Sequence, residues 1–255
     1  MPDRFGTRGN VTAAREEYDE LPSTQDRAIA LARGGAPEGT RVVARSQSRG
    51  RGRLDHGWSS PPGGLYLSVV LRPTPAPSPL LPLAIGAGLA DELARRWSVR
   101  PRLKWPNDLL CESPPERARK LSGILVDTVA DRTGPAAVAG IGVNVARPPG
   151  GLPTGGPLAP VALDELVRPC PPLADVEEAA ASAALGAAAA LGDPIGAARL
   201  LGRCRSLLYG VGRPATVDGV PRGRIATVAD DGALVLDQDG ERVEVRAGDV
   251  RVEGP

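Results

Sequence analysis

Residues 104–110 read KWPNDLL, and residues 120–125 read KLSGIL. The residue before a proline is held extended, and the asparagine and aspartate after it favour a tight turn. The first stretch therefore predicts a strand that breaks at a turn, with Lys104 at the end of the strand. The second stretch places Lys120 at the mouth of another strand, where Gly123 lets a ligand lie against the sheet. The alternative is an ordinary β-turn with an exposed lysine.

The rarity of lysine strengthens the functional interpretation. Of the 31 basic residues only two are lysine, Lys104 and Lys120, and 29 are arginine. Abundant Ala, Gly, Pro and Arg indicate GC-rich coding, under which surface lysines drift to arginine. A lysine that stays marks a place where a compact ammonium is needed and a planar guanidinium does not fit. Chance survival is the alternative, but both lysines and two of the three asparagines fall within residues 104–144, which favours function.

Composition limits the class of protein. The net charge of +1 argues against a dedicated nucleic-acid binder. Cys111, Cys170 and Cys204 are odd in number without a CxxC, and the chain has one histidine, so a structural zinc site is not expected. Free thiols suit a reducing cytoplasm. The N-terminus lacks a signal-peptide core, and no apolar run approaches transmembrane length. We therefore expect a cytoplasmic protein with no membrane partner and no nucleic-acid partner.

The hydrophobic pattern predicts an α/β (α+β) fold with a mixed sheet flanked by helices over residues 1–208. Residues 1–20 read as a loose start. A helix capped by Ser23 or Thr24 should follow and stop at Gly34. Short alternating strands with Asp-Gly turns predict a small β-barrel over residues 209–255. The remaining expected elements are strands at 41–47 and 64–71, a helix at 82–97, two strands joined by a hairpin at DRTG, and helices at 174–191 and 194–207.

A loop rich in arginine and glycine lies between two expected strands. Its arginines, Arg49, Arg51 and Arg53, alternate with glycines ahead of Trp58. Glycine lets the backbone approach a ligand, and arginines can clamp phosphate oxygens bidentately. The tryptophan could close over an aromatic base. A flexible basic arm for nucleic acid is the alternative, but the loop leads into a buried strand, which favours a small-molecule site.

Taken together, these motifs resemble those of the biotin protein ligases. The resemblance rests on STQ, GRGRxxxxWxSPxGGLYLS, KWPNDLL, KLSGIL and GIGVNV, in this order over residues 23–145. The small C-terminal barrel is similar to the SH3-like domain of these enzymes. Regulatory members carry an N-terminal DNA-binding domain, but here the motifs begin at Ser23. The resemblance is therefore to the monofunctional type, without a role in transcription.

The resemblance implies a reaction in two steps. Biotin's carboxylate attacks the α-phosphate of ATP, which gives biotinyl-5'-AMP and pyrophosphate. A lysine of a biotin carboxyl carrier protein domain then attacks the mixed anhydride. The implied small molecules are ATP, Mg²⁺ and biotin.

The resemblance also implies roles for individual residues. The implied catalytic residues are Lys120, between the carboxylate and the α-phosphate; Arg51 and Arg53, facing the carboxyl and phosphate groups; and Asp108, near the metal and phosphates. The implied binding residues are Ser23, Thr24, Gln25, Gln47 and Gly50 around the biotin ring, Trp58 on the loop over the adenylate, Asn144 near the adenine, and Lys104, Trp105, Asn107, Gly123 and Ile124.

The chain departs from the family pattern at two places. Gln25 stands where asparagine is usual, and residues 54–57 read LDHG where many members have Arg-Gly-Arg; we assign no role to His56. The segment 146–160 carries no motif. A lipoate or octanoate ligase of the same fold and a nucleic-acid-binding module remain alternatives. The sequence leaves open the identity of the carrier protein and the oligomeric state, with a homodimer as one option.

Overall fold

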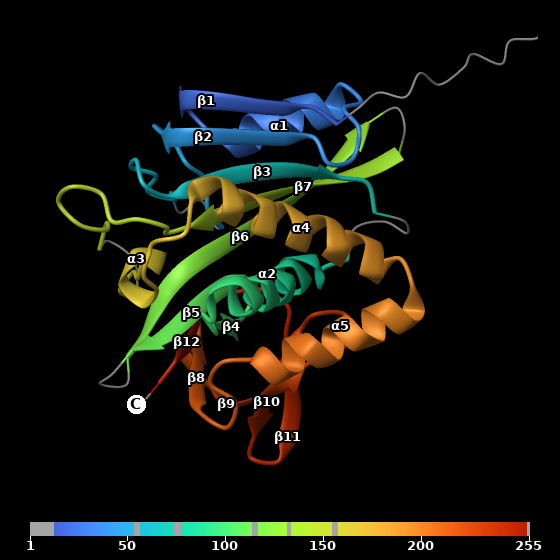
Figure 1. The fold of residues 1–255 in the computed structure, drawn as a ribbon. Helices are drawn as coiled ribbons and strands as arrows, with labels where there is room; N and C mark the ends of the chain where they lie inside the picture. Colours follow the sequence, from blue (N-terminus) through green and yellow to red (C-terminus); the bar gives the residue numbers. More distant parts are fainter. Residues whose placement is uncertain are drawn as a thin grey trace, which may run out of the picture.

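A seven-stranded mixed sheet forms the centre of the molecule (Figure 1). The computed structural model describes residues 13–53, 57–73, 78–113, 117–131, 134–154 and 158–253. Strands β1 and β2 run parallel, and every other neighbouring pair in this sheet is antiparallel. Across the sheet the order is β1 (Arg15–Leu21), β2 (Arg41–Gln47), β3 (Leu65–Leu71), β7 (Gly134–Val143), β6 (Arg117–Asp131), β5 (Asp108–Ser113) and β4 (Arg102–Lys104).

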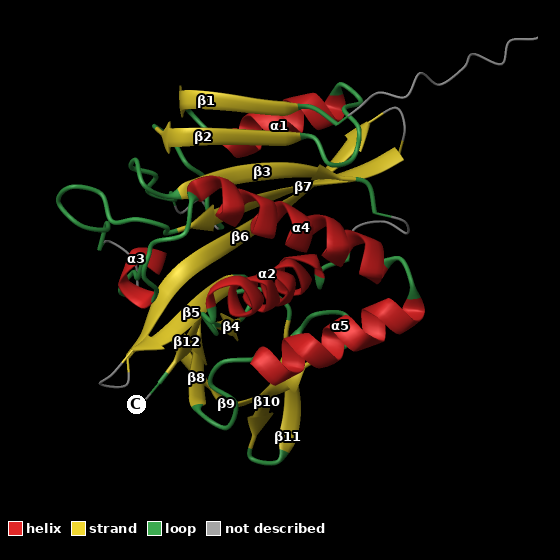
Figure 2. Cartoon of the chain, in the orientation of Figure 1, coloured by secondary structure: helices red, strands yellow, loops and turns green. Residues whose placement is uncertain are grey.

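Helices cover both faces of this sheet (Figure 2). On one face lies α1 (Thr24–Arg33), which Ser23 caps by accepting a hydrogen bond from the Asp26 N–H at 3.3 Å. The other face carries α2 (Leu81–Trp97) and α4 (Leu173–Leu191), and α5 (Pro194–Leu207) packs against both of these helices. A single turn, α3 (Leu163–Leu166), precedes α4. The predicted α/β fold and its helices are confirmed.

Alternation along β3 separates an apolar face from a polar one. Its odd-numbered residues pack with α2 and α4 in the main core, whereas Ser68 hydrogen-bonds to α1 and Val70 packs against Ala28. The whole strand is buried, as its near-continuous apolar character predicts. On β7, Gly140 lies opposite Ser68 and therefore faces α1 as well. Small and polar residues on the α1 face leave room for a pocket there.

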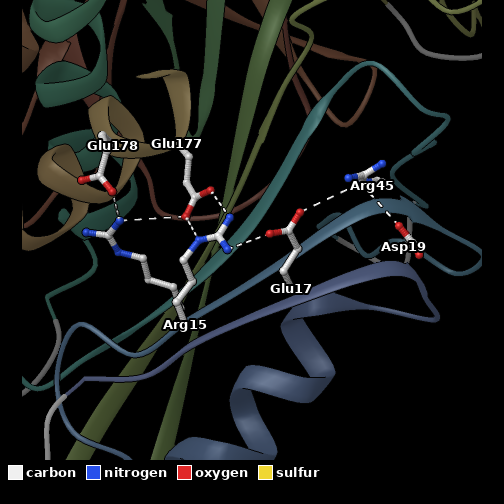
Figure 3. A network of polar contacts seen from close by, with 7 residues as sticks. Arg15, Glu17, Asp19, Arg45, Glu177 and Glu178 are labelled. Atoms are coloured by element: carbon white, nitrogen blue, oxygen red, sulfur yellow. Dashed lines mark hydrogen bonds and ion pairs between the residues drawn. The ribbon is translucent and has the colours of Figure 1, made fainter. Parts of the chain in front are cut away.

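The prediction of a loose start over residues 1–20 is wrong for residues 15–20, which belong to the edge strand β1, whereas residues 1–12 lie outside the described residues. Charged side chains hold this strand in place (Figure 3). Arg15 donates from Nε and Nη2 to the carboxylate of Glu177 on α4, each at 2.8 Å, and from Nη1 to Glu17 at 2.8 Å. Glu177 is only 4% exposed. A charged edge strand is compatible with a sheet when its charges find partners, which a reading of apolar periodicity does not detect.

A second, five-stranded antiparallel sheet follows the helices. Its order is β11 (Glu241–Val245), β10 (Leu234–Gln238), β9 (Val220–Val228), β8 (Pro214–Val217) and β12 (Val250–Val252). The predicted short strands are confirmed, while closure into a barrel and the domain boundary at 208 stay predictions. Residues of this sheet belong to the same hydrophobic cluster as the main core, so the two sheets are packed together.

Two further predictions concern the strands and the membrane. β6 and β7 pair in register from Ser122 with Val143 to Asp131 with Gly134, which confirms the hairpin at DRTG. Among the described residues, no helix combines the length and apolar character needed to cross a bilayer. Leu54, Asp55 and His56 lie outside the described residues.

Candidate active site

A cavity of about 800 Å³ opens on the α1 face of the large sheet. Nearly all the residues singled out from the sequence line it; Arg49, Gly50 and Trp105 do not. The lining residues among them are Ser23, Thr24, Gln25, Gln47, Arg51, Arg53, Trp58, Lys104, Asn107, Asp108, Lys120, Gly123, Ile124 and Asn144. The fold thus brings together motifs that are far apart in the chain.

One part of the cavity is a network of neutral polar groups. The Gln47 side chain accepts hydrogen bonds from the Thr24 backbone N–H at 2.7 Å and from its hydroxyl at 3.1 Å. Ser68 lies within 3.0 Å of both the Thr24 hydroxyl and Gln25 Oε1. Because Thr24, Gln25 and Ser68 are buried, these bonds fix the side chains in one arrangement before a ligand arrives.

Gln25 uses its amide within the protein. Its Nε2 donates to Asp127 Oδ2 and to the Val138 carbonyl, each at 3.0 Å, and its Oε1 accepts from Ser68. A Cβ added at Gly140 would lie 2.5 Å from Gln25 Oε1. The glycine therefore makes space for the longer side chain, which forms the floor of the cavity.

The Arg/Gly loop folds back on itself beside this network. The Trp58 N–H donates to the Gly50 carbonyl at 2.9 Å, and the Ser60 hydroxyl links Gln47 Nε2 at 2.8 Å to the Trp58 carbonyl at 3.0 Å. A Cβ at Gly50 would lie 2.3 Å from the Trp58 carbonyl oxygen. Glycine is required at 50 for this close backbone approach.

The Trp58 indole lines the cavity and rests against the sheet at two glycines. Added Cβ atoms at Gly123 and Gly142 would lie 2.8 Å and 2.6 Å from its ring atoms, so these glycines form its seat. The Lys120 ammonium lies 5.0 Å from the ring centroid, a cation–π distance. The indole N–H is buried without a hydrogen-bond partner. Trp58 thus connects the loop to Lys120.

Charged residues gather in another part of the cavity. Lys120 Nζ lies 2.8 Å from Asp108 Oδ1. Burial lowers the pKa of Lys104, which is 8% exposed, although the charges of Asp108 and Asp249 oppose this. Burial also lowers the pKa of Arg53, against the same two carboxylates. Burial removes water from these two cations, and the nearby carboxylates offset this loss only in part. The cavity therefore favours an anionic ligand.

Two asparagines tie the strand ends around this cluster. Asn107 Nδ2 donates to the Ile124 carbonyl at 2.8 Å, which fixes the KWPND turn against β6. Asn144 Nδ2 donates to the carbonyls of Lys120 at 3.2 Å and Val161 at 3.1 Å. Their contact with a ligand stays a prediction, because the amide N–H groups described here hold the backbone.

Trp105 lies away from the cavity, in the main core. It is 4% exposed, and its indole N–H donates to the Gly232 carbonyl at 3.0 Å. This contact connects the KWPND turn to the second sheet. The arrangement favours a structural role over the predicted role in ligand binding.

Several residues of the cavity were not identified from the sequence. Gly248, Asp249 and Arg251 come from the end of the second sheet, and Pro153, Leu158 and Pro160 come from the segment without a motif. That segment is fixed at its end, since the Lys120 N–H donates to the Ala159 carbonyl at 2.8 Å. No spacing pattern predicts these long-range contacts. Asp127, which contacts the lining residues Gln25 and Arg51, does carry a local signal, because its charge follows the apolar run GILV.

The residues of the cavity fit a magnesium ion that is bound partly by the substrate, and not one that is held by the protein alone. Among the described residues no group of three His, Cys, Asp or Glu side chains could hold a metal ion. Mg²⁺ is commonly bound by one or two carboxylates together with substrate phosphates. Asp108 lines the cavity and offers one such carboxylate, so the residues fit an ion that arrives with a nucleotide.

Comparison with known proteins agrees with this geometry. Residues 20–144, which carry β2 to β7, the end of β1 and most of the cavity, match the biotin/lipoate A/B protein ligase family. This stretch of the chain is similar to the biotin/lipoate A/B protein ligases. Part of the cavity lies outside it, at residues 153–160 and 248–251.

Two bacterial proteins are among those similar to this stretch in sequence. The bifunctional ligase/repressor BirA of Bacillus subtilis is 36% identical over 155 residues, which cover 59% of this chain and 46% of BirA. The biotin–[acetyl-CoA-carboxylase] ligase of Mycobacterium tuberculosis is 36% identical over 135 residues, which cover 50% of this chain and 47% of that protein. The chain therefore spans about half the length of the curated relatives it matches.

The fold of the chain also has a solved counterpart. The structure of biotin protein ligase from Aquifex aeolicus in complex with biotin and ATP is similar with a TM-score of 0.80. The similarity covers 94% of this chain and 99% of that chain at 24% sequence identity. This likeness confirms the fold class, including the second sheet after the helices.

Proposed function

We propose that the protein is an ATP-dependent biotin ligase. It activates biotin as biotinyl-5'-AMP with release of pyrophosphate, and transfers the biotinyl group to a lysine of a biotin carboxyl carrier protein domain. The names of its relatives support biotin as the acid. The proposal extends the similarity of residues 20–144 to the activity of the whole chain.

One observation carries this proposal. The only two lysines of the chain line the same cavity, together with Arg51, Arg53 and the Trp58 indole. The cavity keeps two ammonium groups, although almost all other basic residues of the chain are arginine. It is therefore suited to an anion that binds best to a compact positive charge. A carboxylate next to an α-phosphate is such an anion.

The residues can perform the first step by electrostatics and positioning. A carboxylate oxygen of biotin attacks the α-phosphorus of ATP, and the bond from this phosphorus to the pyrophosphate oxygen breaks. Negative charge builds on the phosphate oxygens, where Lys120 and Arg53 would stabilise it. In the ligand-free protein Lys120 is held by Asp108 and Trp58, so its ammonium is already placed in the cavity.

The second step requires that water be kept from the mixed anhydride. The amine of the carrier lysine attacks the acyl carbon, AMP leaves, and the amine loses a proton. In the ligand-free protein the Trp58 indole rests on Gly123 and Gly142, the surface on which a ligand was expected to lie. The ring would therefore have to lift when the anhydride forms, and it would then cover the anhydride while the carrier approaches. Mg²⁺ held by Asp108 and the phosphates would neutralise charge on the nucleotide.

ATP–pyrophosphate exchange tests the first step. Purified protein with Mg²⁺ should exchange label only when biotin is present, and lipoate should not replace biotin. Lys120→Ala should lower the exchange rate about 10²–10³-fold, because it removes a preorganised charge from the transition state. Arg45→Ala is the matched control, since it also removes one positive charge but from an exposed side chain on β2.

The other outcomes have definite meanings. Exchange that depends on lipoate alone would make the protein a lipoate ligase of the same family. Exchange with neither acid would contradict the proposal. A second assay, transfer of labelled biotin to a purified carrier domain, tests the second step, and Lys→Arg at the acceptor position of the carrier should abolish labelling.

A further inference from the structure

A carboxylate outside the motifs connects two parts of the cavity. Asp127 Oδ2 accepts a hydrogen bond from Gln25 Nε2 at 3.0 Å and lies 3.2 Å from Arg51 Nη1. The same Arg51 nitrogen lies 3.0 Å from Asp26 Oδ1 on α1. Gln25 on the floor and Arg51 on the loop therefore share one carboxylate oxygen.

The sheet register explains why Asp127 can reach both partners. Asp127 on β6 lies directly opposite Val138 on β7, and Leu125 lies opposite Gly140, so these side chains leave the same face of the sheet. This is the face that carries α1 and the cavity. Gln25 enters from the first turn of α1 and bonds both members of the Asp127–Val138 pair.

Gln25 and Arg51 differ in how firmly the protein holds their side chains, and this difference determines what the shared carboxylate of Asp127 does. Gln25 is 4% exposed and is fixed by Ser68 and Val138. The Arg51 side chain is 38% exposed and lies on a loop, where Asp26 of α1 is its other carboxylate partner. Asp127 adds a second contact that ties the guanidinium to the fixed floor, and so further limits its rotamers and reduces the entropy lost when a ligand binds.

Resting on the proposed function, we infer that Asp127 is a positioning residue that couples Gln25 to Arg51. Asp127 does not touch the acid ligand. It holds the Arg51 guanidinium beside the floor, where the carboxylate of a bound acid competes with Asp127 and Asp26 for it. A change at Gln25 is then felt at Arg51, although these two residues lie on different elements.

A double-mutant cycle measures this coupling directly. The dissociation constant of biotin is measured by calorimetry for the full chain and for Gln25→Asn, Arg51→Ala and the double variant. Independent sites give multiplicative effects, whereas residues that share a partner do not. We expect the loss caused by Arg51→Ala to be at least about threefold smaller in the Gln25→Asn background, because coupled sites typically differ by this factor or more.

The same cycle in an Asp127→Ala background shows whether Asp127 transmits the coupling. There the two effects should become multiplicative. Asp26→Ala is the matched control, since it removes the other carboxylate of Arg51 without touching Gln25, and the coupling should persist. Asp127→Asn, which keeps an acceptor for Gln25 and loses the charge that holds Arg51, provides the test if the alanine variant does not fold.

The outcomes separate this inference from the proposed function. Biotin binding with multiplicative effects in the wild-type background would overturn the role of Asp127 and leave the ligase proposal intact. Coupling that survives in both Asp127 variants would overturn it as well. If lipoate binds and biotin does not, the cycle is run with lipoate. Binding of neither acid would overturn both.

Discussion

At the scale of single residues, the surviving lysines show how composition can indicate a site. Lys104 and Lys120 both line the cavity, and each has a carboxylate nearby. The Lys120 ammonium lies over the Trp58 ring and beside Asp108 as a compact charge, whereas the guanidinium of an arginine is larger and planar and has a different contact geometry. Rarity in one chain identified these positions, although it did not identify Asp108 as the partner of Lys120.

The three cysteines should differ sharply in reactivity. Burial raises the pKa of Cys111 and of Cys204 to about 12, so both thiols stay protonated at neutral pH and are covered by the core. Cys170 is exposed, and its pKa is raised by partial burial. Because the thiolate is the reactive form, native protein should react with a disulfide reagent slowly and only at Cys170.

Ellman's reagent checks this expectation by counting released thiolate. One equivalent should appear in native protein, faster as the pH rises toward the Cys170 pKa, and three should appear after unfolding in guanidinium. Cys170→Ser should remove the native equivalent. Rapid release of two or three equivalents from native protein would contradict the burial of the other two thiols.

At the scale of elements, strand β7 provides part of the surface on which the Trp58 indole rests. Gly142→Ala would place a Cβ 2.6 Å from the Trp58 indole, and the ring is easier to move than the sheet. We expect the emission of Trp58 to shift to the red as the ring becomes solvated, and the KM for ATP to rise about tenfold, which corresponds to losing roughly 1.4 kcal/mol of contact. Fluorescence and exchange kinetics measure the two effects.

Two reference variants make the assignment specific. Trp58→Phe identifies the Trp58 contribution, because Trp97 and Trp105 also emit. Gly186→Ala on α4 introduces a Cβ with nothing within 4 Å and should leave both readouts unchanged. Unaltered emission in Gly142→Ala would show that the indole does not occupy this seat in solution.

The edge strand β1 is attached to α1 by an ion pair that titrates at low pH. Arg27 donates two hydrogen bonds of 2.8 Å to Glu16, and these bonds hold the pKa of the Glu16 carboxyl below its ordinary value. A depressed pKa means that the folded state releases this proton more readily than the unfolded chain. The stability contributed is therefore present above the unfolded value and is lost as the pH falls through the folded value.

Glu16→Gln should lower the free energy of unfolding near pH 7 and have little effect at the lowest pH. Because the Arg27 side chain is 41% exposed, solvent screening limits the expected difference to about 0.5–1 kcal/mol. Urea unfolding of the variant and the wild type at neutral and acidic pH measures this. Glu20→Gln, an exposed position on the same strand, is the control. A difference that persists unchanged at low pH would indicate packing rather than charge.

The elements also show what the sequence could and could not predict. Strand β3 and helices α2, α4 and α5 follow from apolar periodicity and glycine or proline boundaries, and the motif order predicted most of the cavity. β1 was missed because its sequence, REEYDEL, has almost no apolar character and depends on partners such as Glu177, far along the chain. Asp249 reaches the cavity from the last strands by long-range packing, which local patterns do not encode.

At the scale of the whole molecule, the two sheets share one core. Val217, Ile225, Leu234 and Val250 of the second sheet belong to the cluster that contains α2 and the large sheet. The Tyr209 N–H donates to the Leu103 carbonyl at 2.7 Å, so backbone hydrogen bonding also crosses the predicted boundary. Two units that share a continuous core should lose it together. The domain boundary predicted at residue 208, where the sequence pattern changes, is therefore not expected to separate two units that unfold independently.

We therefore expect calorimetry to show one unfolding transition for the full chain. In Trp105→Phe this transition should occur at a lower temperature and should remain single. The variant keeps a ring in the core but leaves the Gly232 carbonyl without the indole donor, which should cost about 1–3 kcal/mol. For a chain of this size each kcal/mol corresponds to a shift of roughly 2–4 °C. Trp97→Phe, on the partly buried end of α2, is the matched control and should shift the transition less. Two separate transitions in the wild type would mean that the second sheet unfolds by itself, and the contribution of Asp249 to the cavity would then depend on a unit that can detach.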